Sequence, residues 1–282
     1  MEILLNVRND SELLAANRGL YDPLWRDARL VEPECFNTWP LIRSLVAVAG
    51  RRLEVAPGLR PRLPIVGTSF VDISMHALAK LAACGGSPAI APIGRLPFAD
   101  RTFDVLCALD VIEHVDDDES AMAELARVAT LDATLVLSTP LHPGMWTPFD
   151  DFVGHRRRYE PQQIEKLLQR HGFTIERSAV FGMKPRSSFL QGLGLWFLKH
   201  QRERAMWWYN RVMPYSVRWQ KPLHLQDSLM NTDEVGEILL VCKLGSLNRK
   251  PAVHLNSQAL LHMPGRGCRQ EGDAEGRPLC CG

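Results

Sequence analysis

The chain has 282 residues, of which 46% are apolar, and its charges nearly cancel, leaving a net charge of +1. This composition predicts a globular core and does not favour nucleic-acid binding. No run approaches the roughly 18 apolar residues that a membrane span requires, and the first residues lack the basic-then-apolar order of a signal peptide. The seven cysteines show no CxxC spacing, so we predict neither a disulfide framework nor a metal site. We expect a cytoplasmic protein.

The two ends of the chain differ from its middle. Thr38 can cap a helix that has Pro40 in its first turn and Gly50 as its stop, and Ser11 can cap an earlier helix. The last residues show no apolar periodicity, which is typical of disorder. We therefore predict an N-terminal helical cap, a central domain and a disordered tail: 1–50, 51–245 and 246–282.

Strand and helix patterns alternate through the central domain. Helices are expected to begin at Ser74, Asp116 and Pro161. Strands are expected at 53–55, 69–72, 88–91, 103–109, 134–138, 173–183 and 237–243. This alternation predicts an α/β fold with a parallel sheet and helices on both faces. Functional groups then gather at the carboxyl ends of the strands, which is where the sequence places Glu54, Asp72, Asp110 and His142.

The first strand leads into a loop that we expect to open a helix. Fourteen residues after Gly58, Asp72 closes the second strand, a position where a carboxylate accepts both hydroxyls of a ribose. A dinucleotide would need three spaced glycines beside a helix N-terminus. Ala56, Arg60 and three prolines occupy this loop instead, and proline removes amide donors. The loop therefore favours a nucleoside without phosphates, of which S-adenosyl-L-methionine is the common one.

Several blocks together resemble class I S-adenosylmethionine-dependent methyltransferases that act on small molecules. The blocks are LEVAPG at 53–58, VDIS at 71–74, LPFADRTFDV at 96–105, ALDVIEHV at 108–115, GHRRRY at 154–159 and HGF at 171–173. The resemblance covers about 51–173 and implies a Rossmann-like, seven-stranded sheet that the two last strands complete.

The resemblance also implies roles for individual residues. Glu54 and Gly58 would belong to the loop that holds the methionine end of the cofactor. Asp72 would bind the ribose hydroxyls, Ile73 would pack against the adenine, and Asp110 would face the cofactor, with His114 nearby.

This chain departs from the family pattern at three positions. Ala56 and Arg60 stand where the family usually has glycine, and Pro92 stands where an acidic residue would contact the adenine amino group.

Structural roles compete with these assignments. Asp72 could simply precede a helix capped by Ser74, and Glu54 could form a buried pair with a basic residue. The acidic run 116–119 is better explained as the first turn of a helix, where carboxylates suit the helix dipole.

A polar and aromatic loop follows the fifth strand and includes the two histidines that we predict as catalytic, His142 and His155. Methyl transfer depends mainly on alignment and the exclusion of water. A hydroxyl acceptor also benefits from a general base, and a histidine with a pKa near neutrality suits that role. The alternative is a structural loop held by an Asp150 or Asp151 pair with one of the arginines at 156–158.

A long insertion at 184–233 separates the last two strands. Its first part, 184–222, holds eight Lys and Arg residues against one acid and four of the seven tryptophans. One interpretation is a helical lid over the acceptor pocket; the other is peripheral contact with the inner face of a membrane or with a lipid carrier. Both favour a small-molecule, lipid-linked or saccharide acceptor with an anionic group and an apolar portion.

The sequence as a whole predicts an S-adenosylmethionine-dependent methyltransferase that modifies its acceptor at oxygen. The alternative function is a catalytically inactive protein of the same fold that binds a partner. A nicotinamide oxidoreductase is disfavoured because of the proline-filled loop. The sequence does not indicate an oligomeric state.

Overall fold

The computed structural model describes residues 15, 18, 19, 21–182 and 188–245. The helix start at Ser11 and the tail at 246–282 lie outside the described residues. Within the expected N-terminal cap, residues 21–27 are helical, η1 spans Pro33–Cys35 and α2 spans Trp39–Val46. The predicted proline stands in the first turn of α2, but the Thr38 side chain makes no capping hydrogen bond.

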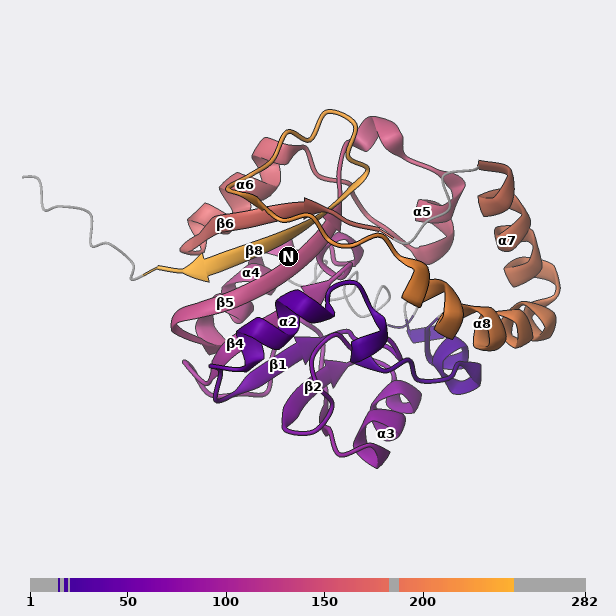
Figure 1. The fold of residues 1–282 in the computed structure, drawn as a ribbon, viewed down its shortest axis with the longest axis horizontal. Helices are drawn as coiled ribbons and strands as arrows, with labels where there is room; N and C mark the ends of the chain where they lie inside the picture. The colour runs from indigo at the N-terminus through magenta and orange to yellow at the C-terminus, as the bar shows by residue number, and fades with distance from the viewer. Residues whose placement is uncertain (1–14, 16–17, 20, 183–187, 246–282) are drawn as a thin grey trace, which may run out of the picture. The chain divides into compact units, whose positions relative to one another are not determined.

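The described residues form one sheet of eight strands (Figure 1). The strands are β1 Arg52–Val55, β2 Thr68–Asp72, β3 Ser87–Ile90, β4 Phe103–Leu109, β5 Ala129–Pro140, β6 Phe173–Val180, β7 Gln226–Asp227 and β8 Glu237–Leu244. Their order across the sheet is β3-β2-β1-β4-β5-β8-β6-β7. β1 to β5 pair in parallel, whereas β8 is antiparallel to both β5 and β6. The Rossmann-like α/β fold is confirmed, with one strand more than expected: β7, which pairs with β6 through two residues.

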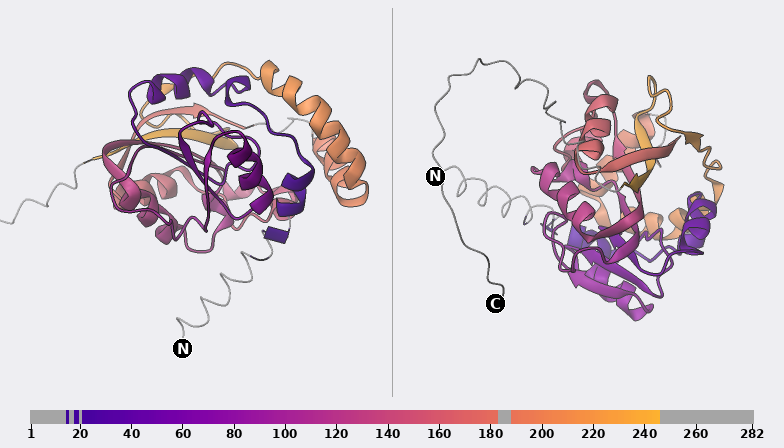
Figure 2. Two further views of the ribbon diagram at one scale, coloured as in Figure 1. Left: turned by 90° about the horizontal axis from the view of Figure 1, so that it is seen from below. Right: turned by 90° about the vertical axis from the view of Figure 1, so that its left-hand side faces the viewer.

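Helices cover both faces of the sheet (Figure 2). Successive residues of a strand point to opposite faces, and β5 shows the result. Val136 belongs to the core that Ile42 of α2 completes. Its neighbour Leu135 belongs to the other core, with Leu125 of α4 (Asp118–Val128) and Leu168 of α6 (Pro161–Arg170). This two-sided burial fixes the register of the sheet and therefore the edge where its strands end.

The connection between β1 and β2 is a loop, so the helix expected after the first strand is wrong. None of the residues at 56–67 is helical. Pro57, Pro61 and Pro64 lack the amide proton that a helix interior requires, and their rings fix φ. α3 (Met75–Ala83) begins only after β2, as expected, and the Ser74 hydroxyl caps it by accepting from the Ala77 amide.

The acidic run at 116–119 forms the start of α4, as expected. Asp117 is the N-cap and accepts from the Ser120 amide, while Asp118 and Glu119 occupy the first turn. Three short elements lie in the connections at the carboxyl ends of β4 and β5. η2 (Ile112–His114) follows β4, and η3 (Pro143–Met145) and α5 (Pro148–Val153) follow β5.

The insertion is largely helical, as predicted, with α7 at Ser188–His200, α8 at Arg202–Ser216 and η4 at Val217–Trp219. α7 packs against α5, which places the insertion beside the loop that follows β5. Among the described helices, none has both the length and the apolar character needed to cross a bilayer.

Candidate functional site

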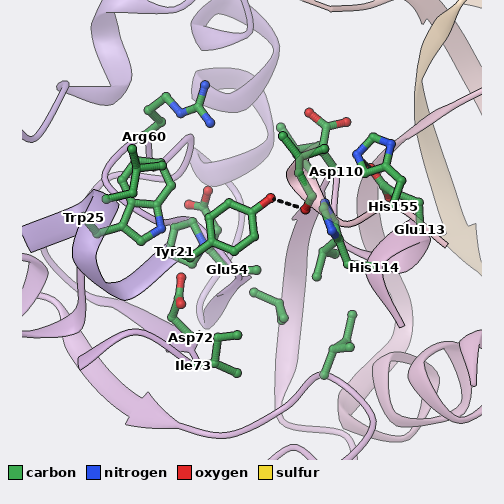
Figure 3. Close-up of a pocket in the computed structure, with 18 of the residues that line it drawn as sticks. Tyr21, Trp25, Glu54, Arg60, Asp72, Ile73, Asp110, Glu113, His114 and His155 are labelled. Carbon is green, nitrogen blue, oxygen red and sulfur yellow. Dashed lines mark hydrogen bonds and ion pairs between the residues drawn. The ribbon is translucent and has the colours of Figure 1, made fainter. Parts of the chain in front are cut away.

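A cavity of about 810 Å³ lies at the carboxyl ends of β1, β2 and β4 (Figure 3). It extends from the first helical segment, past the strand ends, to α5 and α8. Its volume falls within the range of roughly 300–1,000 Å³ that is typical of small-molecule sites. Of the predicted site residues, the cavity is lined by Glu54, Asp72, Ile73, Asp110 and His155.

Asp72 lies at the end of β2 with its side chain at the cavity and is buried, with 5% of its surface exposed. Its Oδ2 accepts from the Gly58 amide at 3.0 Å and its Oδ1 from the Ser74 amide at 2.8 Å. Burial raises the pKa of Asp72, although the backbone hydrogen bonds oppose that rise. A carboxylate has about four lone-pair sites, so both oxygens can accept further hydrogen bonds from a diol.

Gly58 shapes the loop beneath Trp25 and does not itself line the cavity. Its φ is +53°, and a Cβ built there would lie 2.3 Å from the Trp25 ring. Ala56 also has a positive φ, of 53°, at the position where the family usually has glycine. Arg60 places its guanidinium carbon 5.5 Å from the centre of the Trp25 ring. The loop thus forms a closely packed wall.

Glu54, in β1, holds the same loop through hydrogen bonds to its backbone. Its carboxylate accepts from the Arg62 amide at 2.8 and 3.0 Å and from the Leu63 amide at 2.9 Å. Burial outweighs these bonds and the nearby Arg62 charge, and raises the pKa of Glu54 to about 7. Glu54 therefore has a structural role through backbone amides, rather than the pair with a basic side chain that was the structural alternative, while its place on the cavity wall is compatible with the cofactor role.

Tyr21 and Trp25 come from the first helical segment, and the sequence interpretation gave neither of them a role. Their rings stack at 6.3 Å, and the Tyr21 hydroxyl donates to the Val153 carbonyl at 3.1 Å. Tyr21 also meets His114 edge to face at 5.8 Å. Lys80 of α3 holds this segment through three carbonyls, those of Trp25, Arg26 and Ala28. The contacts are long-range, and helical periodicity alone does not reveal them.

Asp110 follows β4 in a backbone conformation that is unusual for a residue other than glycine, with φ at 50°. Its Oδ1 accepts from the Ser138 hydroxyl at 2.6 Å, and its amide donates to the same side chain at 3.0 Å. Such strain is often found at functional sites. Pro92, where an acid was expected by resemblance, lines the cavity as an apolar residue together with Ile93.

His155 is held by a buried ion pair. Its Nδ1 lies 2.8 Å from Oδ1 of Asp150, and Asp150 accepts two hydrogen bonds of 2.9 Å from Nη2 of Arg158. Asp150 is fully buried. The predicted Asp–Arg pair in this loop is therefore confirmed as Asp150 with Arg158, and the same pair orients His155. Arg157 instead pairs with Asp118 at 2.8 Å.

His142 is placed differently. Its Nε2 lies 2.7 Å from the Thr232 carbonyl and its Nδ1 lies 3.6 Å from Glu160. His142 is not among the described residues that line the cavity. The structure therefore brings only one of the two predicted catalytic histidines, His155, to the site.

One stripe of the α7–α8 pair closes the far side of the cavity. In α8 its residues are spaced three or four apart, as one helix face requires: Arg202, Met206, Tyr209 and Met213. Leu198 joins them from α7. The stripe is mostly apolar and carries one cation. This arrangement supports the lid interpretation of the insertion.

Comparisons with known proteins agree with this architecture. Residues 66–137 match the family model described as "Methyltransferase domain". A probable S-adenosylmethionine-dependent methyltransferase of Mycolicibacterium smegmatis is 32% identical over 88 residues, which are 30% of this chain and 34% of that protein. An ajmaline N-methyltransferase of Rauvolfia serpentina is 27% identical over 81 residues, or 29% of this chain and 25% of that protein.

The chain therefore spans about a third or less of the length of these curated relatives. A solved S-adenosylmethionine-dependent methyltransferase of Thermotoga maritima, a possible histamine N-methyltransferase, is 13% identical with a TM-score of 0.48, covering 73% of this chain and 90% of its own. Residues 66–137 are therefore similar to the methyltransferase domain of S-adenosylmethionine-dependent methyltransferases, which agrees with the resemblance seen in the sequence. The cofactor of those proteins is S-adenosyl-L-methionine.

Proposed function

We propose that this protein transfers a methyl group from S-adenosyl-L-methionine to an oxygen of a small-molecule, lipid-linked or saccharide acceptor. The observation that carries the proposal is the single cavity that joins Asp72 and Ile73 at one end to His155 and Arg202 at the other. A donor and an acceptor held in one cavity meet the main requirement of the reaction, which is alignment.

The cofactor side of the cavity fits an adenosine. Asp72 offers lone pairs to both ribose hydroxyls, and Ile73, Pro92 and Ile93 provide an apolar wall for the adenine. When bound, the cofactor supplies an electrophilic methyl group on a sulfonium. Asp110 adds negative charge near that cation, Glu54 lies on the adjoining cavity wall, and Tyr21 covers the cation from the N-terminal segment.

The acceptor side fits an amphiphile. Phe149 and Phe152 of α5 face the apolar stripe of α8 across the cavity, and Arg202 offers a charge for a carboxylate or phosphate. Of the two histidines predicted as bases, His155 is the one at the cavity, where Asp150 orients it. We propose that His155, together with Glu113 and His114, forms the basic centre that accepts the proton of the acceptor.

The outer side of the insertion supports contact with a membrane that would supply such an acceptor. Trp207 is 50% exposed, Trp208 58% and Trp219 89%, and Arg204 and Arg211 are exposed beside them. Interfacial tryptophans with basic neighbours are typical of helices that lie on anionic lipid. Sedimentation with anionic vesicles should therefore fall for Trp207→Ala/Trp208→Ala and stay unchanged for Leu131→Ser, an exposed apolar residue near the start of β5. Equal sedimentation of the wild type, the double tryptophan variant and the Leu131 control would mean that the insertion acts as a lid and does not contact the membrane.

A transfer assay tests the proposed activity. The full chain is incubated with cofactor carrying a radiolabelled methyl group and with cell extract, which is then separated into lipid, small-molecule and macromolecular fractions. Label in the lipid or small-molecule fraction, lost in His155→Asn, supports the proposal. Cofactor binding with no transfer to any fraction would favour the alternative, a catalytically inactive binding protein of the same fold.

A further inference from the structure

We propose that Glu113, His114 and His155 form a binding site for a divalent transition-metal cation on the acceptor side of the cavity. No sequence motif indicates this site, because its ligands come from two loops about 40 residues apart rather than from a closely spaced motif. The sheet brings the two loops together at the ends of β4 and β5.

The three side chains converge at one point of the cavity wall (Figure 3). One ligand atom from each lies within 4.8 Å of the other two. Nε2 of His155 is 3.8 Å from Oε1 of Glu113, and the two imidazole rings lie 4.6 Å apart. Metal–nitrogen and metal–oxygen bonds of about 2.0–2.2 Å place ligand atoms about 3–3.5 Å from one another. Cation binding would therefore draw the three donor atoms closer together by side-chain rotation.

The surroundings of His155 are those of a metal ligand. A histidine that binds a metal usually donates its other ring nitrogen to a carboxylate, which fixes the tautomer and the ring orientation. Nδ1 of His155 makes that contact with Asp150, which Arg158 holds in turn, so Nε2 is left on the side of Glu113.

The backbone also joins the two loops. The Arg156 amide donates to the Glu113 carbonyl at 2.7 Å, one residue away from His155. His114 is held on its other side by the ring of Tyr21. The two loops and both imidazole rings are therefore held in place before any cation binds, which lowers the cost of forming the site.

Two imidazoles and one carboxylate select the kind of ion. This donor set suits first-row transition cations with open coordination positions, whereas magnesium and calcium prefer oxygen ligands throughout. All three donors line the cavity, so the open positions would face the acceptor.

The site has a consequence that depends on the proposed methyl transfer. A cation held by Glu113, His114 and His155 would lower the pKa of an acceptor hydroxyl, whose proton would pass to water. In the transfer, the acceptor oxygen would form the new bond with the methyl carbon, the sulfur–carbon bond would break, and its electron pair would stay on sulfur as a neutral thioether. The cation would thus do the work of the basic centre, and His155 would act as its ligand.

Titration of the chelator-treated full chain with Co²⁺ alone tests the site without cofactor or acceptor. Coordination by nitrogen and oxygen gives visible absorption bands, which should appear at one equivalent. Glu113→Gln and His155→Asn should each weaken binding by more than about tenfold, and Asp150→Asn by about 10- to 100-fold through the orientation of His155. The matched control is His171→Asn. His171 does not line the cavity, and its Nε2 lies 2.7 Å from Oε2 of Glu119.

Several outcomes would overturn the site. These are no visible bands, equal affinity in all variants, loss of binding in the His171 control, or the near-ultraviolet charge-transfer band that marks cysteine ligands. Thermal melting without metal shows which variants remain folded, and His155→Asn and Glu113→Gln serve as independent tests. Titration with S-adenosylhomocysteine on the same samples tests the cofactor site of the proposed function separately. Cofactor binding depends on Asp72, which is not one of the proposed metal ligands.

Discussion

Two loops that follow parallel strands face each other across the cavity, and each is built around a buried carboxylate. In the loop after β1, Glu54 is held by the backbone amides of Arg62 and Leu63. In the loop after β5, Asp150 is held by the guanidinium of Arg158 and by the imidazole of His155. The first loop has no helix, and the second has only the three-residue η3 and the six-residue α5.

The difference between the two loops shows how partner chemistry decides what a buried acid can do. Neutral amides only partly offset the burial of Glu54, so its pKa is raised to about 7 and its charge is costly near neutral pH. A guanidinium supplies a full opposite charge and two directed hydrogen bonds, so Asp150 can hold a neighbouring histidine in place. The first loop is suited to shaping a wall and the second to positioning a reactive group.

The largest effect should follow from breaking the second loop's ion pair. Asp150→Ala would leave the Arg158 guanidinium buried without its carboxylate, at a cost of about 3–5 kcal/mol in the free energy of unfolding. Denaturant unfolding measures this cost. The control is Asp116→Ala, which removes an exposed pair with Arg156 at 3.4 Å and should change stability by less than about 1 kcal/mol. Equal effects of the two substitutions would refute the role given to Asp150.

The loop after β1 should instead make the stability of the protein depend on pH, through Glu54. The folded pKa of Glu54, about 7, lies above its ordinary value of 4.5, so the folded state keeps a proton that the unfolded state has lost. Stability should therefore decline as pH rises from about 4.5 to 7, by about 3 kcal/mol from this group. Glu54→Gln should remove that part of the slope. An identical pH dependence in the variant and the wild type would show that burial does not govern this carboxyl.

A smaller effect is expected from the packing of the first loop against Trp25. Gly58→Ala should destabilise the protein by about 1–3 kcal/mol, because the new methyl group meets the indole and the positive φ is strained. Gly144→Ala is the matched control, since nothing lies within 4 Å of a Cβ there. Thermal melting compares the two, and a Gly58 variant as stable as the control would mean that the loop and Trp25 move apart freely.

The parts of the fold that depend on local pattern could be predicted from the sequence. Seven strands follow from apolar runs, the cap at Ser74 follows from residue type, and the acidic run at 116–119 marks the start of α4. The prediction of a helix after β1 was wrong because three prolines in that segment prevent a helix interior. β7 has two residues and no pattern of its own.

The candidate site was predicted less completely, because it depends on contacts between distant segments. Acids at strand ends could be found, since the edge of a parallel sheet is known once the strands are known. Tyr21 and Trp25 reach the cavity through the way their helix docks on α3, which no periodicity reports. The choice between His142 and His155 depended on which loop carbonyl or carboxylate each ring meets.

The central claim is that one cavity holds the cofactor with its ribose at Asp72. Calorimetric titration of the full chain with S-adenosylhomocysteine tests it most directly. Wild type should bind one equivalent, Asp72→Asn should bind about 10- to 100-fold more weakly through the loss of charge-assisted hydrogen bonds, and the exposed Asp100→Asn should match wild type. No heat with wild type, or equal affinity in both variants, would contradict the assignment.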